Sequence, residues 1–166
     1  MLEFHSPQII GSAADMKRLP PLHLPVAEND KIRIGGNEGT VFDTPGHTIG
    51  HISVYFEASK LLFSADTLMA LGCGRLFEGT AEQMWHSLQK LSKLPDDTLV
   101  CSGHEYTEKN ADFALTIDPK NQELVNRVQF TKKIRAEGVP TVPSSLGEEK
   151  KTNPFLRPWN KNIRTK

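Results

Sequence analysis

Residues 43–51 read Asp-Thr-Pro-Gly-His-Thr-Ile-Gly-His and directly follow a short strand-like apolar run. The Pro-Gly pair turns the chain sharply, so the imidazole of His47 can project from the strand end toward a shared cleft. The same design recurs at Phe63-Ser-Ala-Asp66 and at Leu99-Val-Cys-Ser-Gly-His104. Taken singly, a histidine beside Pro-Gly is more often a turn residue, and a strand-end aspartate is more often a cap. Three strand ends of one design favour a common site.

The three side chains have the chemistry of metal ligands. Zinc accepts imidazole nitrogen and carboxylate oxygen, and a catalytic zinc site keeps one position open for water. Asp66 can bridge two cations, because each carboxylate oxygen can bind one. Metal binding lowers the pKa of water from about 15.7 to near 7, which makes hydroxide available as a nucleophile. His47, Asp66 and His104 therefore predict half of a two-metal hydrolytic site.

The other half of such a site would need a His-x-His-x-Asp-His cluster earlier in the chain. Residues 1–46 contain the isolated His5 and His23 instead. A serine or cysteine nucleophile is not indicated either, since neither residue lies in a recognisable nucleophile elbow.

Apolar periodicity predicts a layered arrangement of strands and helices. Helical spacing is expected over 80–94, with Thr80 and Gln83 in a capping box, and over 107–117. A further helix is predicted over 119–136, with Asp118 as its N-cap and Pro119 in its first turn. Strands are expected at 7–11, 31–34, 40–43, 51–57, 60–66 and 98–102. Irregular structure is expected elsewhere: one or two helical turns after a Ser12 N-cap, an extended loop over 19–25, a tight turn over 35–39 and an irregular segment from Val139 onward.

Length, charge and cysteine content narrow the class of protein. A chain of 166 residues fits one domain of ordinary size. Basic and acidic residues balance at 20 each, which predicts neither a nucleic-acid partner nor binding to a membrane surface. Cys73 and Cys101 are too few for a disulfide framework, and no run reaches the ~18 apolar residues of a spanning helix. We expect a soluble protein of the reducing cytoplasm.

Six sequence runs resemble one known family: TPGHTIGHIS (44–53), SADTL (64–68), GCGRLFEGT (72–80), SGHEYT (102–107), PTVPSSLGEE (140–149) and NPFLR (153–157). With these runs, the chain is similar to glyoxalase II, the hydroxyacylglutathione hydrolase branch of the metallo-β-lactamase superfamily, from about residue 10 to 160. The histidine and aspartate runs alone would indicate only the superfamily, whereas GCGRLFEGT, SGHEYT and NPFLR narrow the resemblance to this branch.

The resemblance implies a fold and a division of the chain. The expected class is α/β, in the sense of a four-layer α+β fold. Residues 1–106 would form part of the αββα metallo-β-lactamase sandwich. Residues 107–166 would form part of the C-terminal helical region that binds glutathione.

The resemblance also implies roles for individual residues. His47 matches the ligand of the first metal, Asp66 the bridging and catalytic ligand, and His104 the ligand of the second metal. His51 matches a histidine that supports the site without binding metal. Arg75, Phe77 and Tyr106 match positions that contact the substrate. Phe77 stands where many members carry a tyrosine, so we expect no hydroxyl contact there.

The implied reaction is hydrolysis of an S-(2-hydroxyacyl)glutathione thioester to glutathione and a 2-hydroxy acid, a step in methylglyoxal detoxification. The implied cofactors are two zinc ions per site, with iron or manganese as alternatives. The partner would be the small glutathione thioester, with no nucleic acid and no membrane.

The departures from the family leave two further interpretations open. The chain lacks the family's His-x-His-x-Asp-His motif, and the basic residues near the end of the family's helical domain would lie beyond Lys166. Both ends are therefore expected to be cut, and the missing N-terminal part is expected to leave an apolar surface and a strand edge exposed. It would then be an inactive fragment, or a half-protein that needs an N-terminal segment in trans. A mononuclear iron dioxygenase acting on glutathione persulfide would need fewer ligands, but the GHEYT and NPFLR runs argue against it.

Overall fold

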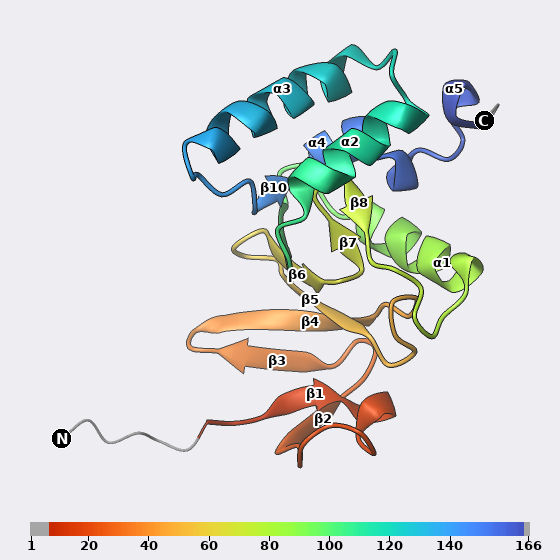
Figure 1. Cartoon of the computed structure of the whole chain (residues 1–166). Coiled ribbons are helices and arrows are strands. Elements are labelled where there is room, and N and C mark those ends of the chain that lie inside the picture. The colour runs from red at the N-terminus through yellow and green to blue at the C-terminus, as the bar shows by residue number, and fades with distance from the viewer. Residues whose placement is uncertain (1–6, 165–166) are drawn as a thin grey trace.

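The computed structural model describes residues 7–164, and a six-stranded sheet forms its centre (Figure 1). The strand order is β10-β9-β6-β5-β4-β3. Strands β6 and β9 pair in parallel, and the other neighbours pair antiparallel. The strands are β3 (Lys31–Ile34), β4 (Asn37–Asp43), β5 (Ile52–Phe56), β6 (Leu61–Ala65), β9 (Leu99–Ser102) and β10 (Ser144–Ser145).

One face of the sheet carries the main hydrophobic core. Tyr55, Leu62 and Val100 lie on this face, because they occupy paired positions on β5, β6 and β9. Helix α1 (Ala81–Ser92) packs on them with Met84, Leu88 and Leu91, and α4 (Leu146–Thr152) and the 3-10 turn η2 (Pro154–Leu156) complete the cluster. The capping box of α1 is present as predicted: Thr80 accepts from the Gln83 N–H, and the Gln83 side chain accepts from the Thr80 N–H.

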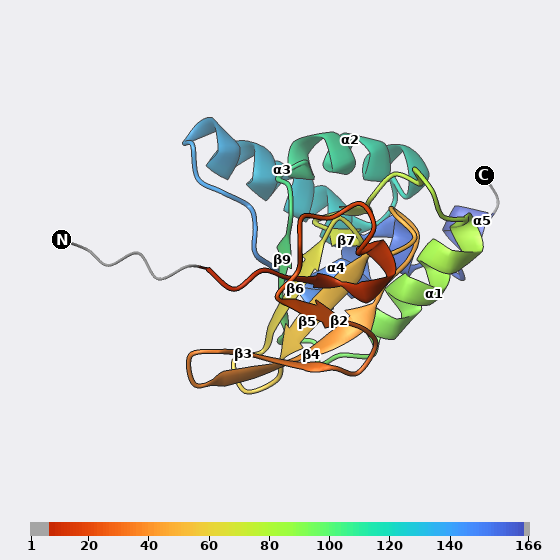
Figure 2. The ribbon, with the colours of Figure 1, turned by 90° about the horizontal axis from the view of Figure 1, so that it is seen from below.

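The opposite face of the sheet is only partly covered. A two-stranded parallel sheet, β1 (Ile10–Ser12) and β2 (Leu24–Val26), packs over β3–β5, where Val26, Val41 and Phe56 are buried (Figure 2). Farther along the same face, Phe63 is 47% exposed and Leu99 is 40% exposed. The face therefore ends in an open apolar strip over β6 and β9.

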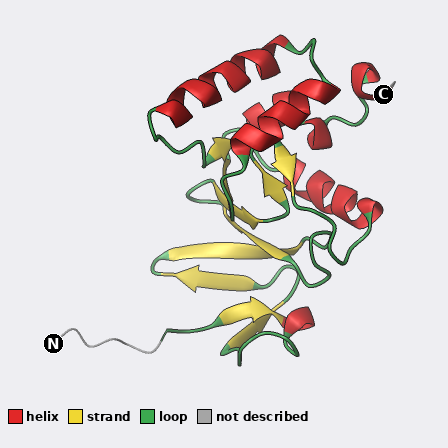
Figure 3. Cartoon of the chain, viewed as in Figure 1, coloured by secondary structure: helices red, strands yellow, loops and turns green. Residues whose placement is uncertain are grey.

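A helical layer lies above the sheet (Figure 3). It contains α2 (Thr107–Ile117) and α3 (Gln122–Ala136), and the short α5 (Lys161–Arg164) follows near the end of the chain. A small hairpin of β7 (Leu68–Met69) and β8 (Gly72–Cys73) reaches this layer, and Leu71 at its tip is buried among Ala111, Ala114, Leu124 and Val128.

The mixed α/β class predicted from the sequence is confirmed, and several local predictions are corrected. Helix α3 begins at Gln122 with Asn121 as its N-cap, because the carboxylate of Asp118 is taken by Arg157 at 2.6 Å. The segment after Val139 is not irregular: Ser145 caps α4, and β10, η2 and α5 also lie there. The loop predicted over 19–25 contains the start of β2. The turn predicted over 35–39 is shorter, because β4 begins at Asn37. Ser12 precedes the 3-10 turn η1, but its side chain makes no capping hydrogen bond. Strands β7 and β8 were not predicted. The division at residue 106 stays a prediction.

No helix within residues 7–164 is long and apolar enough to cross a membrane.

An ion pair joins the N-terminal part of the chain to a loop beside the sheet. The guanidinium of Arg18, after the 3-10 turn η1 (Ala13–Asp15), binds both carboxylate oxygens of Glu78, and the Ile49 N–H donates to Glu78 at 2.9 Å. The hydrogen bond from Arg18, followed by that from Ile49, lowers the pKa of Glu78 from its usual 4.5 to about 2. Three separate segments are therefore held together around one carboxylate.

The sheet core gives the first prediction. Leu62 is fully buried, so Leu62→Ala should lower the free energy of unfolding by about 2–5 kcal/mol in urea titrations. Ile34→Ala is the control, because Ile34 is 61% exposed, and it should change stability by less than about 0.5 kcal/mol. Equal losses in the two variants would contradict this placement of the core.

The second prediction concerns Glu78. Arg18→Gln should raise the pKa of Glu78 from about 2 toward its usual value, as followed by carboxyl NMR titration. Because the pKa is lowered in the folded state, the stabilisation is complete above the usual pKa and is lost as the pH falls toward about 2. Arg33→Gln, which removes a pair with Glu38 on β3–β4, should leave Glu78 unchanged. An unshifted Glu78 in Arg18→Gln would refute the assignment.

Candidate functional site

His47 stands in a loop that two neighbouring segments hold in place. The loop follows β4, and its Gly46 has φ of 148°, where a side chain would meet the backbone of Met84. The N–H groups of Phe77 and Gly79 donate to the carbonyls of His47 and Gly46 at 3.1 Å each. Nδ1 of His47 lies 2.8 Å from the carbonyl of Arg75, and since a carbonyl can only accept, Nδ1 carries the proton. Nε2 of His47 faces Asp66.

Asp66 is aimed by an irregularity at the end of β6. The pairing with β9 shifts register between Phe63 and Ala65, and Ala65 has a left-handed φ of 42°. Gly74 crosses directly against this turn: a Cβ at Gly74 would lie 1.9 Å from the Asp66 carbonyl oxygen. The bulge and the crossing together direct the Asp66 carboxylate toward the two histidines.

The three predicted ligands come together as expected. Oδ1 of Asp66 lies 2.7 Å from Nδ1 of His104, and Oδ2 lies 3.5 Å from Nε2 of His47. The side chains of His47 and Asp66 are 17% and 20% exposed, whereas that of His104 is 50% exposed and stacks on Tyr106 with 5.0 Å between ring centroids. The carboxylate therefore lies between the two imidazoles.

His51 lies behind Asp66. Its Nε2 accepts from the Asp66 N–H at 3.2 Å, and its Nδ1 contacts the hydroxyls of Thr67 at 2.9 Å and Thr44 at 3.0 Å. Burial, followed by the nearby His47, lowers the pKa of His51. The ring holds the backbone of Asp66, and its role outside the ligand set stays a prediction.

Six of the seven predicted site residues line one cavity of about 540 Å³. Arg75, Phe77 and Tyr106 share it with the three candidate ligands, and the ring of Phe77 lies 4.7 Å from that of His47. His51 does not line it. The cavity thus combines metal-type donors, an arginine and two aromatic rings.

Five further lining residues were not predicted: Met69, Cys73, Gly74, Lys109 and Asn110. Lys109 adds a second positive charge beside Arg75. A signal for it was available, because Lys109 follows Tyr106 by three residues at the start of a predicted helix, and such residues share a helix face.

The described donors do not complete a metal centre. Across residues 7–164, no group of three or more His, Cys, Asp or Glu side chains has the arrangement that holds an ion. Each of two ions would receive one imidazole and one oxygen of Asp66, whereas zinc ordinarily takes three or four protein ligands. The donor chemistry suits zinc, but the donor number does not.

Two family descriptions match adjoining parts of the chain. Residues 10–104 match the metallo-beta-lactamase superfamily, and residues 105–166 match the C-terminus of hydroxyacylglutathione hydrolase.

Curated relatives match over nearly the whole chain. A hydroxyacylglutathione hydrolase of Cereibacter sphaeroides is 59% identical over 150 residues, which cover 90% of this chain and 59% of that protein. One of Ruegeria pomeroyi is 56% identical over 161 residues, covering 97% and 63%. The chain therefore spans about three fifths of the length of these relatives.

Solved structures share the fold. The crystal structure of ETHE1 from Myxococcus xanthus superposes with a TM-score of 0.61 and 28% identity, covering 89% of this chain and 50% of that one. The BLEG-1 B3 metallo-beta-lactamase also gives a TM-score of 0.61, at 23% identity, over 90% of this chain and 65% of its own. The two family descriptions and the curated relatives agree. The chain belongs to the metallo-β-lactamase superfamily and, within it, to the hydroxyacylglutathione hydrolase family.

Proposed function

We propose that this chain carries the substrate pocket and part of the metal-ligand set of a hydroxyacylglutathione hydrolase. The single observation that carries the proposal is that Asp66, between His47 and His104, lines the same cavity as Arg75, Phe77 and Tyr106. The proposed reaction is hydrolysis of the thioester of a 2-hydroxy acid with glutathione, which consumes water and yields a carboxylic acid and a thiol.

The cavity suits an anionic peptide thioester. Glutathione carries two carboxylates, and Arg75 and Lys109 place two positive charges on the cavity lining. The ring faces of Phe77 and Tyr106 offer apolar contact to the remainder of the substrate. Phe77 has no hydroxyl, so its contribution is packing alone.

Membership of this superfamily implies metal ions. We assign His47 and His104 as one ligand for each of two ions and Asp66 as the bridge, with zinc favoured by the nitrogen and oxygen donors. His51 would fix the backbone of Asp66 rather than bind metal. Because three donors leave both ions short of ligands, we infer that hydrolysis needs further ligands from outside the described residues. A partner segment that supplies them in trans would meet this need.

The substrate pocket yields a binding prediction. Arg75→Gln and Lys109→Gln should each weaken binding of S-hexylglutathione, an uncleavable thioether analogue, by about tenfold in calorimetry, because each removes a charge-assisted bond worth about 1.5 kcal/mol. Lys132→Gln on α3 is the matched control, since Lys132 lies outside the cavity and pairs with Asp112. If both cavity variants bind S-hexylglutathione as tightly as the unaltered chain, this cavity is not the glutathione-binding pocket.

The metal centre yields a separate prediction. The chain alone should bind zinc weakly, and Asp66→Asn should abolish that binding, whereas Asp112→Asn, on the exposed surface of α2, should not. Thioester hydrolysis should rise when the part of a curated relative that this chain does not match is added in trans. Tight binding of two zinc ions by the chain alone, measured by calorimetry and elemental analysis, would contradict the inferred need for more ligands.

A further inference from the structure

The hairpin of β7 and β8 ends in a strained turn that is buried in the helical layer. Its two turn residues are Ala70 and Leu71. Leu71 has a left-handed φ of 58°, a conformation that is unfavourable for residues other than glycine. Leu71 is fully buried against α2 and α3. Such a conformation persists only where the surroundings hold it.

Three side chains from distant parts of the chain hold the backbone of this turn. The Leu71 N–H donates to Oε2 of Glu149 at 2.9 Å. The side-chain amide of Asn153 donates to the carbonyls of Met69 and Gly72 at 3.1 and 3.0 Å, and that of Asn110 donates to the Ala70 carbonyl at 2.9 Å. Every residue from 69 to 72 therefore has a backbone group bound by a side chain from α2, from α4 or from Asn153, directly after α4.

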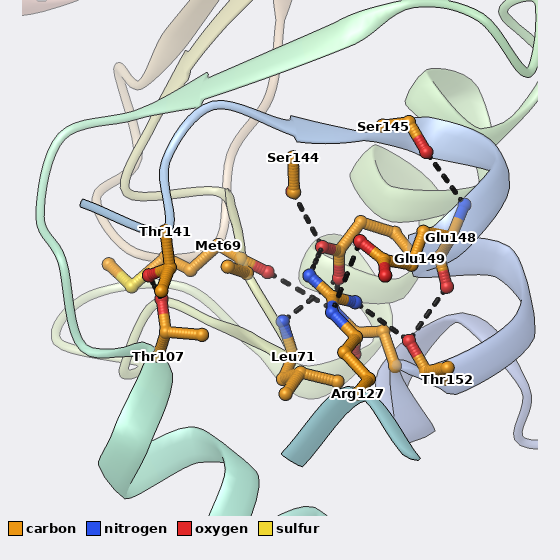
Figure 4. A network of polar contacts seen from close by, with 12 residues as sticks. Met69, Leu71, Thr107, Arg127, Thr141, Ser144, Ser145, Glu148, Glu149 and Thr152 are labelled. Atoms are coloured by element: carbon orange, nitrogen blue, oxygen red, sulfur yellow. Dashed lines mark hydrogen bonds and ion pairs between the residues drawn. The ribbon is translucent and has the colours of Figure 1, made fainter. Parts of the chain in front are cut away.

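Glu149 is the centre of this network, and its carboxylate is fully buried (Figure 4). Oε1 accepts from Arg127 at 2.5 Å and from the Ser144 hydroxyl at 2.6 Å, while Oε2 also accepts from Asn153 at 3.0 Å. Arg127 in turn donates to the Thr152 hydroxyl at 2.7 Å. A buried charge is tolerated only when it is paired and its lone pairs are satisfied, and here each oxygen accepts two bonds.

The base of the same hairpin forms a wall of the candidate site. Cys73, Gly74 and Arg75 follow the turn directly and line the cavity, as does Met69 before it. The carbonyl of Arg75 accepts a hydrogen bond from Nδ1 of His47. A shift of the turn would therefore move the backbone of residues 73–75 and, with it, the hydrogen-bond partner of His47.

We propose that Glu149 and Asn153 are positioning residues of the cavity: by fixing the backbone of residues 69–72, they place the Cys73–Arg75 wall and, through the Arg75 carbonyl, orient His47. That the cavity takes a glutathione thioester rests on the proposed function. The positioning itself does not, so the two can fail separately.

The chain contains its own reporters for the test. Cys73 adjoins the turn, and burial raises the pKa of its thiol to about 12, so it should react slowly with iodoacetamide at pH 8. Cys101 lies on β9, outside the β7–β8 hairpin, and serves as the reference thiol. Both rates can be measured in one sample of the full chain by peptide mass spectrometry.

Glu149→Gln keeps the shape of the side chain but replaces one acceptor oxygen by a donor. We expect Glu149→Gln and Asn153→Ala to raise the alkylation rate of Cys73 at least tenfold, with less than a twofold change at Cys101. Asp118→Asn is the matched control, because it weakens another buried ion pair, with Arg157, without touching the turn. It should leave the ratio of the two rates unchanged.

Two results would overturn the positioning role: equal acceleration of both thiols in Glu149→Gln, which would indicate general loss of stability, or no change at Cys73. If Glu149→Gln does not fold, Ser144→Ala removes one bond to the carboxylate and should still accelerate Cys73 selectively, by a smaller factor.

A binding measurement tests the link from the turn to the cavity. In a chain that binds S-hexylglutathione, Glu149→Gln should weaken binding at least fivefold while Asp118→Asn does not. If Glu149→Gln accelerates alkylation of Cys73 but leaves the affinity for S-hexylglutathione unchanged, the turn does not control the cavity. Absence of binding in the unaltered chain would count against the proposed function, and the thiol rates would still decide the positioning role.

Discussion

A carboxylate removed from water is the constraint on which the arrangement of this chain depends. Glu149 comes from α4, and its donors come from α3, β10, the β7–β8 turn and Asn153. None of these donors can move away without leaving a buried charge short of a partner, which is far costlier than losing a bond at the surface. The helical layer and the sheet are therefore connected by polar bonds at one point, in addition to the apolar contacts around Leu71.

That the side chains of His47, Asp66 and His104 lie close together was predictable from the sequence, because the place of each depends on local signals. His47, Asp66 and His104 all follow apolar runs, and strands β4, β6 and β9 run in the same direction, so their ends lie at one edge of the sheet. The start of α1 was predictable for the same reason, since both partners of its capping box lie within four residues. The sequence pattern predicted an element correctly where its position depends on hydrogen bonds between residues close together in the chain.

Features decided by distant partners were not predictable. Asp118 has the residue type and the following proline of a helix cap, but Arg157, 39 residues later, takes its carboxylate and leaves the capping to Asn121. The β7–β8 hairpin has no glycine at its left-handed position, and Leu71 adopts that conformation because Glu149, 78 residues away, accepts from its N–H. The Ser- and Pro-rich segment after Val139 was predicted to be irregular, but Glu149 and Asn153 within it bind each other and also partners far along the chain, including Leu71 and Arg127.

The crossing at Gly74 also bears on how such a site can change over evolutionary time. A Cβ there would overlap the carbonyl of Asp66, so no other amino acid fits unless the bulge of β6 is rebuilt. Arg75, Phe77 and Lys109 are exposed and can be exchanged without moving that backbone. Substitutions at these exposed positions can therefore change the substrate selectivity of the cavity one residue at a time. The backbone that positions the Asp66 carboxylate cannot change in this stepwise way, because any side chain at Gly74 would overlap it.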